Sequence, residues 1–63
     1  MEEGTEMLRK IETIDVKIKE MKKLAEGIMK EGSEIEAVKR NTKRILASIA
    51  MLEFNVSDVK EVM

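Results

Sequence analysis

The residues with the clearest chemical potential are lysines and arginines concentrated in the middle of the chain. Between residues 17 and 44 there are nine basic and five acidic residues, whereas the whole chain has a net charge of −1. Clustered cations neutralise backbone phosphates and release counterions, so they offer sequence-independent binding of nucleic acid. If the chain folds back on itself near residue 32, seven of these residues come to lie at a similar distance from the turn: Lys19, Lys22, Lys23, Lys39, Arg40, Lys43 and Arg44.

The same basic residues also fit a solvated helix face. Glu26 precedes Lys30 by four positions and Glu36 precedes Arg40 by four, the spacing at which opposite charges pair along a helix. The chain has one Phe and no Trp or Tyr, so aromatic side chains that could stack on single-stranded bases are scarce. The sequence therefore favours a solvated face and leaves nucleic-acid binding as an alternative.

The sequence lacks the residue types that most catalytic and metal sites need. It has no Cys and no His, which excludes disulfides, Cys/His zinc sites and His-based catalytic triads. Glu31, Glu34 and Glu36 lie close together but do not follow the spacing of a calcium-binding loop. We therefore predict a protein that is not an enzyme and has no metal site and no cofactor.

Apolar residues at heptad spacing predict the helices that position these charges. In the first half of the chain they alternate in steps of four and three, a period of 3.5 residues that is typical of coiled-coil helices. The second half has the same steps in reverse order. The two sets are Met7, Ile11, Ile14, Ile18, Met21, Ala25 and Ile28, followed by Ile35, Val38, Thr42, Ile45, Ile49, Leu52 and Val56.

A short turn joins the two predicted helices. Gly32 suits the left-handed position that ends a helix, and Ser33 with Glu36 three residues later fits a capping box that begins the next one. A connection this short makes the two helices antiparallel. Folding at this turn pairs the two apolar sets in seven layers and places Ile18 opposite Ile45.

The sequence thus predicts a single all-α domain over residues 1–63, an antiparallel two-helix hairpin. Asn55 and Ser57 favour capping positions over helix interiors, so we expect a break near Asn55. One long helix that continues through Val59 is the alternative. The expected boundaries are a helix over about 5–31, a turn at 32–33, a helix over about 34–54 and a tail or short third helix over 57–63.

Apolar residues outside the heptad positions predict self-association. Two packed helices of this length bury little surface, and such small domains are marginally stable alone. The segment 45–54 has Glu53 as its only charge, and a helix that is apolar over most of its circumference is a buried helix. Docking of this surface on a larger protein is the alternative. We expect two hairpins to form a four-helix bundle through Leu24, Leu46, Ala47, Ala50, Met51 and Phe54.

Composition and the first residues predict a cytoplasmic protein without a membrane partner. No apolar run approaches the ~18 residues of a membrane span, and the acidic start does not fit a signal peptide. Abundant Glu, Lys and Ile without Gln are typical of thermophilic proteins. The predicted function is that of a small non-catalytic structural or interaction protein that binds itself. The alternatives are a nucleic-acid-binding regulator and a helical subunit of a larger assembly.

Overall fold

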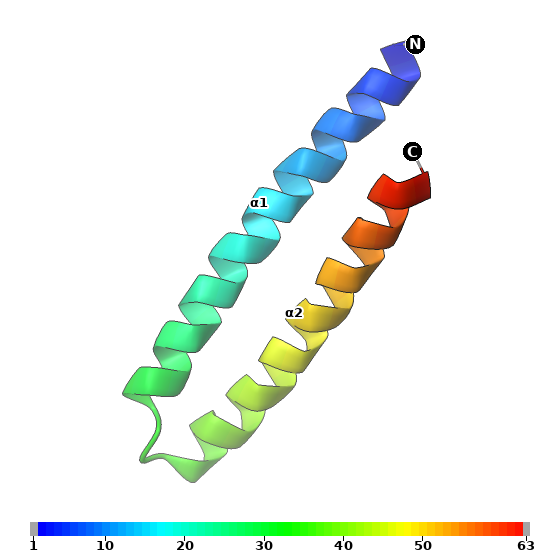
Figure 1. Ribbon diagram of the computed structural model, residues 1–63. Helices are drawn as coiled ribbons and strands as arrows, with labels where there is room; N and C mark the ends of the chain where they lie inside the picture. Colours follow the sequence, from blue (N-terminus) through cyan, green and yellow to red (C-terminus); the bar gives the residue numbers. More distant parts are fainter. Residues whose placement is uncertain (1, 63) are drawn as a thin grey trace.

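Two antiparallel α-helices lie side by side in the computed structural model, which describes the backbone of residues 2–62 and the side chains of residues 4–62 (Figure 1). Helix α1 spans Glu2–Glu31 and helix α2 spans Glu36–Val62. The molecule is a rod with principal extents of 51 × 15 × 11 Å. The predicted all-α hairpin is therefore confirmed.

Each helix buries one narrow row of side chains against the other helix. Residues seven apart repeat on the same face of a helix that packs with a period of 3.5 residues. Ile18, Ala25 and Ile49 form the central cluster, with Leu46 and Val56 packed against it. We name the two buried rows the core column, which consists of Ile11, Ile18 and Ala25 on α1 and Thr42, Ile49 and the half-buried Val56 on α2.

The turn is longer than the sequence pattern suggests, and the register of the helices differs accordingly. The turn occupies residues 32–35, so α2 begins at Glu36. Ile18 packs in one cluster with Ile49, while Ile45 is 47% exposed. The predicted pairing of Ile18 with Ile45 is therefore wrong by one helical turn.

Gly32 is required by close packing and not by a left-handed backbone. No described residue has a positive φ angle, so the predicted left-handed conformation is wrong. A Cβ atom at Gly32 would instead meet Cγ1 of Val38 and would lie 3.1 Å from the carbonyl oxygen of Ile28. The missing side chain allows the start of α2 to lie directly against the end of α1.

Helix α2 begins without the predicted capping box. The Lys39 N–H donates to the Ile35 carbonyl at 2.9 Å, which makes Ile35 the N-cap in place of Ser33. The Ile35 N–H in turn donates to the carbonyl of Gly32 at 2.9 Å and closes a four-residue turn. Backbone hydrogen bonds therefore set the start of α2, and Ser33 is exposed within the turn.

Helix α2 continues through Asn55 to Val62 without a break, so the predicted end at residue 54 and the separate segment 57–63 are wrong. Met63, the last residue of that segment, lies outside the described residues. Val56 packs against the central cluster, and an ion pair holds Lys60 to α1. These contacts outweigh the ~0.5 kcal/mol per residue by which Asn and Ser disfavour helix interiors.

Candidate interaction surfaces

One side of the hairpin carries ion pairs that join the two helices. Nζ of Lys22 lies 3.5 Å from Oε1 of Glu53, and Nζ of Lys60 lies 3.3 Å from Oδ2 of Asp15. Each of these four residues follows a core-column residue by four positions, so all four occupy the equivalent edge of their helix. We name this edge of the hairpin the charged side.

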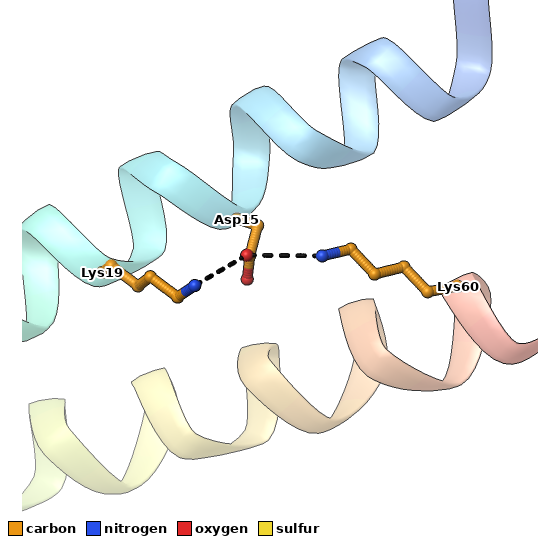
Figure 2. A network of polar contacts seen from close by, with 3 residues as sticks. All are labelled: Asp15, Lys19 and Lys60. Carbon is orange, nitrogen blue, oxygen red and sulfur yellow. Dashed lines mark hydrogen bonds and ion pairs between the residues drawn. The ribbon is translucent and has the colours of Figure 1, made fainter. Parts of the chain in front are cut away.

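Asp15 is the centre of a small charge network on the charged side (Figure 2). Its Oδ2 atom lies 3.1 Å from Nζ of Lys19 and 3.3 Å from Nζ of Lys60. The hydrogen bond from Lys19 holds the pKa of the Asp15 carboxyl below its ordinary value, the bond from Lys60 adds to this effect, and partial loss of solvent opposes it. The network therefore favours the ionised carboxylate and connects the last turns of α2 to α1.

The opposite side of the hairpin is apolar. It holds the residues that follow the core column by three positions, and Met7 continues this row by one heptad. On each helix the residues four positions after the core column lie on the charged side. The residues three positions after it lie on the other side of the core column, so these residues of the two helices lie together on the opposite side of the hairpin. Each of these residues is between 40% and 50% exposed. We name them the apolar stripe: Met7, Ile14, Met21, Ile28, Ile45, Leu52 and Val59.

The apolar stripe shows that the hairpin buries only half of the heptad pattern. The seven predicted layers placed both apolar rows of each helix in one core. A helix with a single neighbour buries the row that points at that neighbour, and the second row, displaced by about 50° around the helix, stays in solvent. The heptad spacing therefore predicted the helices correctly, but the second apolar row of each helix does not face the other helix in the hairpin.

A groove beside the turn extends the apolar stripe. It has a volume of 510 Å³, and Leu24, Ile28, Ile35 and Val38 form the apolar part of its lining. Ile28 belongs to both the groove and the stripe, so the apolar surface reaches the closed end of the hairpin. Ligand-binding pockets usually add convergent polar groups to such a lining, whereas the charged groups that line this groove, such as Lys23, are exposed to solvent.

The residues predicted to form an oligomer interface do not share one face. Leu46 packs against the central cluster and thus stabilises the hairpin itself. Leu24, which is 70% exposed, lies on α1 beside the apolar stripe. Met51 and Phe54 are 61% and 67% exposed. Heptad position places three of the others, Ala47, Met51 and Phe54, toward the side of α2 that faces away from α1, whereas the half-buried Ala50 lies beside the charged side.

The basic residues predicted to contact nucleic acid lie mainly on and around the charged side. Lys19 and Lys22 pair with Asp15 and Glu53 there. Lys39 lies in the same row as Glu53, two heptads earlier, and is half-buried. The remaining predicted residues are exposed around the turn-proximal half of the hairpin: Lys23, Arg40, Lys43 and Arg44.

Within the described part of the chain, no three acidic side chains are placed together to hold a metal ion. Over the same residues, neither helix combines the length and the apolar character that crossing a bilayer requires. Comparisons with known protein families, with curated proteins and with solved structures found no match to this chain. The charged side and the apolar stripe are therefore the surfaces from which a function can be inferred.

Proposed function

We propose that this chain is a small non-catalytic helical interaction protein that acts as a self-associated assembly, with two hairpins forming a four-helix bundle. The apolar stripe carries this proposal. A contiguous row of large apolar side chains on one side of a soluble helical protein marks an interaction surface. The opposite side, with its ion pairs, has the character of a surface that stays in water.

The balance between buried and exposed apolar residues supports the same conclusion. Among the described residues, four apolar side chains are buried, whereas fourteen large apolar side chains are 40% exposed or more. A chain of this size has little other surface to bury, so the isolated hairpin is marginal. Association removes further apolar surface from water, at a gain of roughly 25 cal/mol per Å².

Measurement of mass against concentration tests the proposal. Sedimentation equilibrium or light scattering from about 1 to 100 μM, a range that brackets moderate dimer affinities, should give a mass that rises with concentration to at least twice that of the 7.2 kDa chain. Helix content measured by circular dichroism should rise with concentration over the same range. A constant mass of 7.2 kDa at the highest concentration would refute the proposal.

A nucleic-acid-binding regulator is the second candidate, and the placement of the basic residues supports it. Because these residues lie mainly away from the apolar stripe, an assembly that covers the stripe leaves them accessible. Fluorescence anisotropy with duplex RNA and duplex DNA at low salt should then detect binding that weakens steeply with added salt. Lys43→Gln with Arg44→Gln should reduce this binding, and an absence of binding at low salt would remove this candidate.

A further inference from the structure

The apolar stripe has two chemically different margins. The margin residues precede the core column by one position on each helix, and all are exposed. The α1 margin is basic at two of its three positions, whereas the α2 margin carries no charge in a chain whose charged fraction is 40%. The α1 margin consists of Lys10, Lys17 and Leu24, and the α2 margin consists of Asn41, Ser48 and Asn55.

We propose that a second copy of this chain covers the apolar stripe, with α1 of each copy lying on α2 of the other. This inference rests on the proposed function, because it names the surface and the arrangement through which self-association occurs. The two-fold axis then runs parallel to the helices, and each helix has two antiparallel neighbours. The interface is isologous, as expected for a homodimer.

Charge selects this arrangement over the other face-to-face dimer. If the two-fold axis ran across the helices, α1 would lie on α1 of the second copy, and Lys17, near the middle of its row, would face Lys17 of that copy. Like charges placed opposite each other across an interface are unfavourable. The uncharged α2 margin imposes no such repulsion, so pairing of unlike helices is preferred.

The register of the hairpin also gives the basic margin suitable partners. A two-fold axis parallel to the helices preserves height along the rod, and Ile18 and Ile49 share a layer of the hairpin. Lys17 of one copy therefore comes close to Ser48 of the other, and Lys10 comes close to Asn55. The hydroxyl and amide oxygens of these side chains can accept hydrogen bonds from the lysine ammonium groups.

The extent of the stripe fits a second hairpin. Its seven large side chains, each between 40% and 50% exposed, extend along the hairpin from Met7 in the first turns of α1 to Ile28 beside the turn. A second copy presents helices of the same 30 and 27 residues, so it matches the stripe in length and in width. A single foreign helix would match only the length.

Disulfide crosslinking between different single-cysteine chains tests the arrangement. The chain has no Cys, so introduced thiols have no competitors. In the proposed dimer Ile14 of one copy lies against Leu52 of the other, and a mixture of Ile14→Cys and Leu52→Cys chains should form mainly the mixed disulfide under mild oxidation. In the alternative dimer Leu52 lies near the centre of the α2 row, so Leu52→Cys chains alone would crosslink to each other.

Charge substitutions test the surface independently. Leu52→Glu places a carboxylate in the stripe at a side chain that is 42% exposed in the hairpin, so the hairpin itself tolerates it. We expect this variant to raise the dimer dissociation constant about 100-fold or more, as for a central interface residue. Met51→Glu is the matched control, because Met51 is the neighbouring residue, is 61% exposed and lies outside the stripe.

The outcomes separate this inference from the proposed function. A 7.2 kDa monomer at all concentrations would overturn both. A dimer that crosslinks through Leu52→Cys alone, that forms no mixed disulfide or that survives Leu52→Glu would retain self-association and overturn this arrangement. A dimer lost with Met51→Glu but not with Leu52→Glu would move the interface to the outer side of α2. The mixed disulfide together with dimer loss in Leu52→Glu supports the arrangement.

Discussion

Gly32→Ala adds a single methyl group at the tightest point of the turn. The new Cβ would meet Cγ1 of Val38 and would lie 3.2 Å from Cβ of Val38 and 3.1 Å from the carbonyl oxygen of Ile28. One neighbour is a backbone atom and the other is a β-branched side chain with few rotamers, so neither can yield easily. The first turn of α2 must therefore shift away from α1.

The expected cost follows from overpacking and can be separated from the general effect of replacing glycine. Overpacked sites lose ~1–3 kcal/mol of stability. Gly27→Ala is the matched control, since a Cβ there meets nothing within 4 Å and Gly27 lies inside α1. Alanine is favoured over glycine in a helix by ~1 kcal/mol. The two substitutions should thus change the free energy of unfolding in opposite directions.

Urea and thermal unfolding followed by circular dichroism measure both effects. All variants must be compared at one chain concentration, because association stabilises the folded state by mass action. In a domain of this size 1 kcal/mol corresponds to a shift in Tm of about 4–8 °C. Close packing at Gly32 would be refuted if Gly32→Ala were as stable as the unsubstituted protein, or if adding Val38→Ala to Gly32→Ala did not recover part of the loss.

Two further substitutions test the charge network and the core column. Since hydrogen bonds from Lys19 and Lys60 lower the pKa of Asp15, its stabilising effect is present above the ordinary carboxyl pKa and is lost as the pH falls through the lowered pKa. Unfolding measured against pH should show that Asp15→Asn removes this part of the acid dependence, and an unchanged profile would contradict the network. Ile49→Ala should lower the free energy of unfolding by ~2–5 kcal/mol because Ile49 is 2% exposed. Met51→Ala on the outer side of α2 should change it by less than ~0.5 kcal/mol, and equal losses would place the core elsewhere.

The heptad spacing was sufficient to predict two antiparallel helices, because a period of 3.5 residues depends on local sequence alone. It could not select which apolar row faces the other helix. That choice depends on the register, and the register depends on a turn whose start at Gly32 is set by a contact with Val38. A tertiary contact of this kind leaves no periodic signal in the sequence.

The same limitation explains the errors at the C-terminal end and in the predicted core layers. Asn55 and Ser57 are poor helix residues by intrinsic preference, but Val56 and Lys60 make contacts with α1 that override this preference. Ile14 and Leu52 were predicted in the hairpin core because their spacing is the same as that of buried residues. Only the observed register shows that they form a second apolar row, which the sequence had no means of separating from the first.

Both ends of the described chain lie at one end of the rod, and the turn lies at the other (Figure 1). A two-fold axis parallel to the helices would preserve this direction in the dimer, so that the described ends of both copies lie together and both turns lie at the far end. Such an assembly would have two different ends. Domains fused to either terminus would lie at one end of the dimer. A molecule that binds the turns would lie at the other end, separated from them by roughly the 51 Å length of the rod.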